Sequence, residues 1–89
     1  MEIKVEKVDE TTFQVTVTGR ATTTHTVTLA AAYCDKLTGG KLPPEGLIRR
    51  SFEFLLEREP NTSILRRFDL PLIQTYFPEY EQTIRGMTG

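Results

Sequence analysis

The chain has 89 residues, of which 38% are hydrophobic and 26% are charged, a composition typical of a folded domain rather than of a disordered or membrane-spanning chain. A chain of this length buries only about 60–65% of the surface that its unfolded form exposes, so we expect one modest core and no second lobe to enclose a substrate cleft. Its 11 basic and 12 acidic residues give a net charge of −1, which provides no long-range attraction for nucleic acid or anionic lipid.

Apolar and polar residues alternate in three segments of the first third of the chain, which is the pattern of half-buried strands. The predicted inward-facing residues are Ile3 and Val5, then Phe13, Val15 and Val17, then His25, Val27 and Leu29. Polar residues 9–11 form a turn between the first two strands, and residues 19–21 end the second. These features predict a three-stranded antiparallel meander with one apolar and one polar face.

Two helices are predicted after the strands. Residues 30–37 contain good helix formers, and Gly39 and Gly40 are suited to end that helix. Pro43 and Pro44 open a longer helix over residues 43–59, because proline is tolerated in a first turn. One largely apolar stripe of this helix is expected to cover the apolar face of the sheet, and its residues are Leu47, Ile48, Ser51, Phe52, Leu55 and Leu56.

The remainder of the chain predicts short helices. Residues 61–63 are polar and suited to cap a helical segment that carries Ile64, Leu65 and Phe68. Asp69 is placed to cap another helix that begins at Leu70. Residues 79–85 form the last predicted helix.

Together these elements predict one α+β domain over residues 1–85, followed by a flexible tail at residues 86–89. In this domain, a three-stranded antiparallel sheet packs against one main helix, and short C-terminal helices close the remaining edge. No internal repeat or low-complexity linker divides the chain.

Cysteine content and hydropathy indicate the compartment. Cys34 is the single cysteine, so no disulfide forms within the chain. A small extracellular domain without disulfides is unusual, and we therefore expect a cytoplasmic protein. No apolar run approaches the ~20 residues that cross a bilayer, and residues 1–13 alternate charged with apolar residues rather than forming a targeting segment. We expect no membrane partner.

Few residues are suited to bind metals or to catalyse reactions. A metal site built on nitrogen or sulfur needs three or four ligands, and the chain has one histidine and one cysteine. Gly39, Gly40 and Lys41 precede a helix, but no phosphate-binding pattern surrounds them. The acidic residues fall on predicted solvated surfaces, where carboxylates are poor acid–base catalysts. We expect no metal, no cofactor, no catalytic residue and no enzymatic activity.

Cys34 and His25 provide one catalytic alternative, since a neighbouring imidazole activates a thiolate. Their predicted positions favour structural roles, because His25 faces the core from a strand and Cys34 lies among small apolar residues of a short helix. A cysteine-dependent or redox-sensitive protein that uses Cys34 remains an alternative.

An aromatic cluster lies near the C-terminus at Tyr76, Phe77 and Tyr80. Such a cluster either docks a terminal segment onto the core or contacts a partner. Together with the unpaired edges of the predicted sheet, it is the feature best suited to recognition. We therefore expect a small non-catalytic protein-interaction module, whose partner is another protein or a second copy of the chain.

The helical half of the chain contains the segments SFEFLLEREP at residues 51–60, SIL at residues 63–65 and YFPEYE at residues 76–81, and a Thr-His-Thr-Val-Thr segment precedes them. These segments resemble a family of small uncharacterised bacterial proteins over nearly the whole chain. The resemblance implies a bacterial, cytoplasmic, stand-alone domain with no known activity.

Residues 24–58 combine the segment THTVTL, a short helix, a glycine-containing turn and the segment EGLIRR. This region resembles ribbon-helix-helix DNA-binding proteins, which are dimers whose paired strands enter the major groove. The resemblance implies that Thr24, Thr26 and Thr28 face bases. No Lys, Arg, Gln or Asn stands at an outward position of this strand, and the sequence pI is near 5.8. Nucleic acid is therefore not the expected partner, and a dimeric regulator of this type is the alternative.

Overall fold

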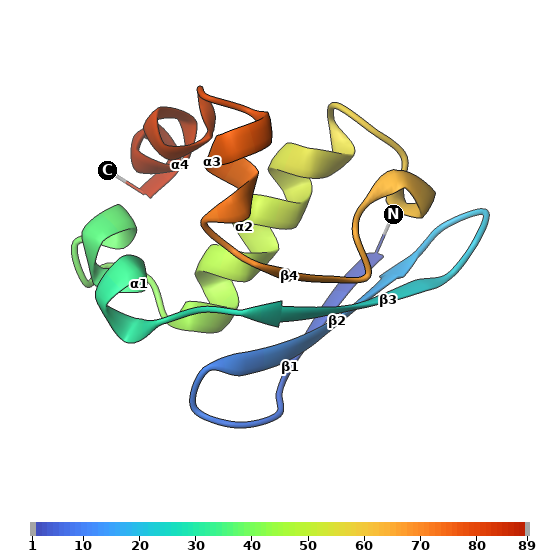
Figure 1. Ribbon diagram of the computed structural model, residues 1–89, viewed down its shortest axis with the longest axis horizontal. Coiled ribbons are helices and arrows are strands. Elements are labelled where there is room, and N and C mark those ends of the chain that lie inside the picture. Colours follow the sequence, from blue (N-terminus) through green and yellow to red (C-terminus); the bar gives the residue numbers. More distant parts are fainter. Residues whose placement is uncertain (1, 89) are drawn as a thin grey trace.

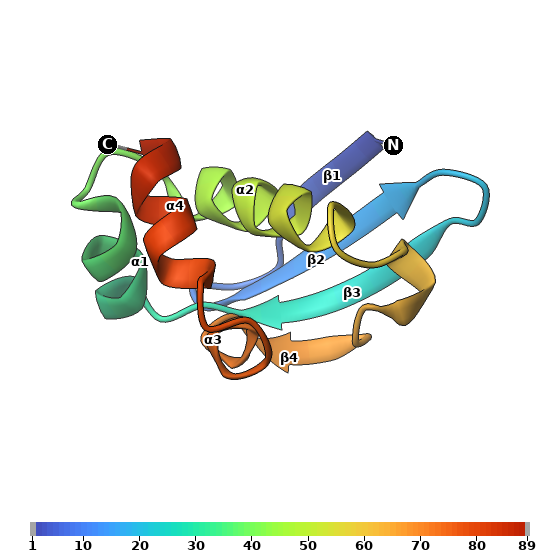
Figure 2. The same ribbon diagram turned by 90° about the horizontal axis from the view of Figure 1, so that it is seen from above.

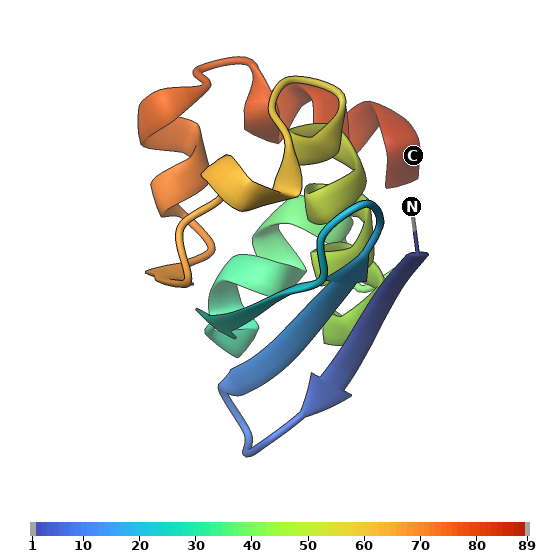
Figure 3. The ribbon, with the colours of Figure 1, turned by 90° about the vertical axis from the view of Figure 1, so that its right-hand side faces the viewer.

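The computed structural model describes residues 2–88, and its helices lie on one side of a four-stranded sheet (Figures 1 and 3). The α+β class expected from the sequence is confirmed. The elements in chain order are β1 (Glu2–Lys7), β2 (Thr12–Thr18), β3 (Thr23–Thr28), α1 (Ala31–Thr38), α2 (Pro44–Leu56), a 3-10 turn (Asn61–Ser63), β4 (Arg67–Asp69), α3 (Leu72–Tyr76) and α4 (Tyr80–Thr88).

The sheet has the strand order β1-β2-β3-β4. The first three strands form the antiparallel meander that the sequence predicts, with Val5 opposite Val15 and Val15 opposite His25. β4 was not predicted, and it lies parallel to β3 with Phe68 opposite Val27. The expected three-stranded antiparallel sheet is therefore corrected to a mixed sheet of four strands.

The largest departure from the sequence-based expectation lies between the end of α2 and β4. Only Asn61–Ser63 is helical there, as a single 3-10 turn, and the chain then extends into β4. The buried Asn61 side chain holds this turn to the sheet, because its amide donates hydrogen bonds to the carbonyl of Ala21 (2.9 Å) and the hydroxyl of Thr23 (3.0 Å). The following residues are thereby led alongside β3 as a strand.

The C-terminal helices also begin and end at residues other than those predicted. α3 begins at Leu72, and Asp69, the predicted cap of this helix, instead accepts a hydrogen bond from the hydroxyl of Thr28. α4 extends to Thr88, so residues 86–88, which the sequence predicted as flexible tail, belong to a helix. The last residue of that predicted tail lies outside the described residues.

α1 and α2 agree closely with prediction. Gly39 ends α1 with φ of 62°, a left-handed conformation that glycine adopts without steric cost, and its N–H donates to the carbonyl of Asp35. α2 begins at Pro44, one residue after the predicted start, and ends at Leu56 rather than at Glu59. None of the helices in residues 2–88 is long and apolar enough to cross a membrane.

α2 joins the two halves of the core because residues on two of its sides are buried. Figure 2 shows α2 lying over the sheet beside α4. Toward the sheet, the Phe52 ring lies 5.4 Å from the His25 ring and 6.1 Å from the Phe68 ring, centroid to centroid. Toward the C-terminal helices, the Phe54 ring lies 5.3 Å from the Tyr80 ring. The core therefore runs from the sheet through α2 to α4.

Replacing Phe52 with alanine tests the packing of α2 on the sheet. Phe52 is fully buried, so we expect Phe52→Ala to lower the free energy of unfolding by about 3–5 kcal/mol, through lost burial and the cavity left behind. Urea unfolding followed by circular dichroism measures the loss. Val8→Ala, at a side chain that is 61% exposed, is the control and should change the free energy by less than about 0.5 kcal/mol. Equal effects of the two substitutions would contradict this packing.

Candidate functional site

A surface groove with a volume of about 340 Å³ opens between α3 and the segment that leads into β4. Leu55 of α2 lines it, together with Ile64, Leu65 and Phe68 from the segment around β4. α3 and the residue after it contribute apolar side chains, which are Leu72, Ile73, Tyr76 and Phe77. The groove is thus apolar, and its polar lining residues are Glu59 and Ser63.

Two apolar side chains at this groove are exposed to an unusual degree. Tyr76 is 64% exposed and Leu65 is 47% exposed. Four large apolar side chains are exposed among the described residues, and the other two are Val8 and Met87. Side chains of this kind around a groove are typical of a contact site for another molecule.

β4 forms one edge of the sheet directly beside the groove. The N–H of Thr26 donates to the carbonyl of Arg66 (2.7 Å), and the N–H of Leu70 donates to the carbonyl of Thr28 (2.9 Å). Successive residues of a strand point their backbone groups toward opposite edges, so those of Arg67 and Asp69 point away from β3. The groove therefore lies next to a strand edge with outward-directed donors and acceptors.

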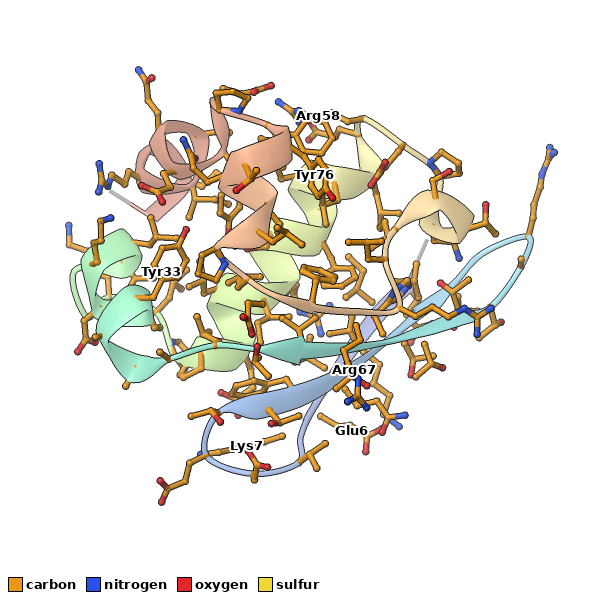
Figure 4. The ribbon with its side chains drawn as sticks, viewed as in Figure 1. Glu6, Lys7, Tyr33, Arg58, Arg67 and Tyr76 are labelled. Carbon is orange, nitrogen blue, oxygen red and sulfur yellow. The ribbon has the colours of Figure 1, made fainter. Side chains whose placement is uncertain are left out.

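The two faces of β4 differ in chemistry. The side chain of Phe68 is nearly buried on the helical side of the sheet, whereas Arg67 and Asp69 are exposed on the uncovered side. Figure 4 shows Arg67 on that uncovered side, together with Glu6 of β1, and Tyr76 on the helical side. Neither Arg67 nor Asp69 forms an ion pair with another residue in the range 2–88.

The predicted aromatic cluster is divided by the structure. Tyr76 is exposed, and Phe77 is half-buried with its ring 5.8 Å from the Phe54 ring. Tyr80 is fully buried, and its hydroxyl lies 2.6 Å from the hydroxyl of Ser51 on α2. The assignment of Tyr80 to an interaction surface is corrected, because this residue docks α4 onto the core.

The three threonines of the DNA-binding alternative lie on the uncovered face of the sheet, but β3 is an interior strand. Its two edges are paired with β2 and β4 of the same chain. A ribbon-helix-helix dimer needs this edge for the twin strand. The pairing implied by that resemblance is therefore absent from this fold, and Thr24, Thr26 and Thr28 form part of a continuous polar sheet surface.

Cys34 and His25 are engaged separately in structural contacts. Cys34 is 4% exposed, and burial raises the pKa of its thiol above the ordinary value. The Nδ1 atom of His25 lies 2.8 Å from the carbonyl of Leu65, and its Nε2 atom lies 2.9 Å from the hydroxyl of Thr23. Because a carbonyl only accepts, Nδ1 is the donor and Nε2 accepts from Thr23. Both ring nitrogens are thus occupied, and neither residue has the environment of a catalytic pair.

His25 instead positions the groove. Its bond to the Leu65 carbonyl joins residues that are 40 positions apart and fixes the backbone that carries the exposed Leu65 side chain. Asn61 completes this network through the shared hydroxyl of Thr23. The alternation of the third strand predicted that His25 is buried, which is confirmed, but nothing in the sequence identified its partner.

No family model, curated protein or solved structure matches this chain. The bacterial family that the sequence resembles therefore remains a prediction. Within residues 2–88, no group of three or more histidine, cysteine, aspartate or glutamate residues is placed to hold a metal ion.

The buried imidazole predicts a pH dependence of stability. Burial lowers the pKa of His25, and the nearby Arg66 lowers it further, although the bond to Leu65 opposes these effects. The unfolded chain, with an ordinary histidine pKa of about 6.5, then binds the proton more tightly than the folded chain. Above about pH 6.5 His25 is neutral in both states and does not lower the free energy of unfolding. Acidification below about that pH protonates His25 more readily in the unfolded chain and therefore favours unfolding.

We expect the free energy of unfolding to fall with decreasing pH below about 6.5, by at most about 1.4 kcal/mol per pH unit from this residue. Urea unfolding at a series of pH values measures the slope, and His25→Gln should have a smaller slope in this range. Equal slopes for the two proteins between pH 6.5 and 5 would show that His25 is not held in its neutral form.

Proposed function

We propose that the chain is a small non-catalytic protein-interaction module, which contacts its partner through the apolar groove and the adjoining edge of β4. The main support for this proposal is the apolar groove. Leu65 and Tyr76 are exposed at this groove, next to the open edge of the sheet. Covering these side chains would remove apolar surface from water, which favours association by roughly 25 cal/mol per Å².

The lining of the groove supports a protein partner over a small polar substrate. Sites for small substrates combine an apolar cavity with several convergent polar groups that fix orientation. Glu59 and Ser63 supply the polar lining here, and the remaining lining side chains are apolar. A strand edge beside the groove adds backbone donors and acceptors, which are features that an extended protein segment uses.

The absence of catalytic activity is part of the same proposal. The thiol of Cys34 is buried with a raised pKa, and the imidazole of His25 is committed at both nitrogens. These environments favour structural roles, because a reactive thiol is exposed and has a lowered pKa. A bacterial, cytoplasmic setting remains part of the proposal from the sequence.

A photo-reactive amino acid at position 76 tests this function in the cells that make the chain. We expect irradiation to join the protein covalently to its partner, because Tyr76 is 64% exposed at the edge of the groove. The same amino acid at position 8, where Val8 is 61% exposed in the β1–β2 loop, is the matched control. A defined adduct from position 76 that is absent from position 8 supports the proposal. No adduct, or identical adducts from both positions, would contradict it.

A further inference from the structure

The outward backbone groups of β4 restrict how any added strand pairs with it. Arg67 and Asp69 each direct an N–H and a carbonyl away from β3, while Phe68, between them, directs its own toward β3. In an antiparallel pair, residues whose groups face the partner strand exchange two hydrogen bonds. An added strand must therefore place hydrogen-bonding residues opposite positions 67 and 69.

A second copy of β4 meets this requirement in one register with opposite charges. When a two-fold axis passes beside Phe68, Arg67 lies opposite Asp69 of the second copy, and Asp69 lies opposite its Arg67. Each of these pairs exchanges two backbone hydrogen bonds, and each brings opposite charges together on the uncovered face of the sheet. The edge is thus self-complementary in backbone groups and in charge.

The neighbouring symmetric registers are unfavourable. A shift that centres the axis on Arg67 places the two Arg67 side chains opposite each other, and like charges in this position are destabilising. A shift that centres the axis on Asp69 places the two carboxylates together and sets Arg67 opposite Pro71, which has no N–H to donate. Charge and backbone chemistry therefore select the same register.

The other edge of the sheet differs because its charges are already paired within one strand. Along β1, Lys4 and Glu6 also stand two residues apart, but they pair with each other at 3.4 Å. The exposed charges of Glu2 and Lys7 flank them, and such charges discourage edge-to-edge association. Arg67 and Asp69 have no such ion pair within residues 2–88, so their charges remain available to another molecule.

We infer that β4 pairs with β4 of a second copy, which makes the chain a two-fold symmetric dimer with one continuous sheet. This inference rests on the proposed function, because it names a second copy as the occupant of the surface formed by the β4 edge and the groove. The groove side of the junction is apolar and carries Phe68 with the exposed Leu65 and Tyr76. Pairing at the edge brings these surfaces of the two copies to the same junction.

Charge reversal at the two positions gives a specific test. Arg67→Asp places two carboxylates opposite each other at both pairs, and Asp69→Arg places two guanidinium groups there. We expect each variant to raise the dissociation constant of the dimer about tenfold or more, measured by sedimentation over a range of concentrations. An equimolar mixture of the two variants restores both opposite-charge pairs, so we expect it to form a heterodimer with an affinity close to that of the unmodified chain.

The double variant Arg67→Asp/Asp69→Arg restores the same pairs within one chain and should dimerise again. Arg20→Asp and Glu10→Arg make the same charge changes in exposed hairpin loops and should leave the dissociation constant unchanged. Thr28→Val removes the hydroxyl that bonds Asp69 without changing charge, and it should also leave the dimer intact. Circular dichroism of each variant confirms that it is folded.

Two outcomes would overturn this inference. The unmodified chain could sediment as a monomer at the highest concentration tested, or the mixture of the two reversed variants could associate no better than either variant alone. If the chain is monomeric and position 76 still forms an adduct with a different protein, the pairing of two copies is wrong and the proposed function stands. If position 76 forms no specific adduct either, both are wrong.

Discussion

The parallel pairing of β4 with β3 is the contact on which the candidate site depends. It sets Phe68 opposite Val27, and the hydrogen bond from His25 to the Leu65 carbonyl holds the residues just before the strand. The turn at Asn61 is tied to the far end of the sheet by its buried amide. Together these contacts place Leu65 and Phe68 at the groove and make β4 the edge strand of the sheet.

The sequence predicts those parts of the fold in which apolar and polar residues alternate with a clear period. Alternation identified the strands of the meander and the burial of His25, and the helical stripe with its opening prolines identified α2. β4 has three residues and one apolar side chain, so it carries no readable period, and its place depends on contacts made by distant residues. Of the predicted aromatic cluster, Tyr76 and Phe77 line the groove, whereas Tyr80 is buried and its hydroxyl bonds to Ser51, a contact that no local pattern indicates.

The two edges of the sheet show how similar residues acquire different roles. Each edge strand carries a basic and an acidic residue two positions apart on the uncovered face. On β1 these charges form an ion pair within the strand, and charges of this kind protect an edge against pairing with another strand. On β4 the charges form no such pair among the described residues and lie beside an apolar groove. An exposed edge is a hazard for a small domain unless it is protected or used. We propose that β1 is the protected edge and β4 the used one.

Amide hydrogen exchange followed by NMR tests the position of β4 most directly. In dilute solution, the amides of Thr26 and Leu70 should exchange slowly because they bond across the β3–β4 pair, while those of Arg67 and Asp69 should exchange rapidly. Raising the protein concentration should slow exchange at Arg67 and Asp69 alone. Rapid exchange at Leu70 and Thr26, equal to that of Arg67, would show that β4 is not part of the sheet and would contradict the account of the site.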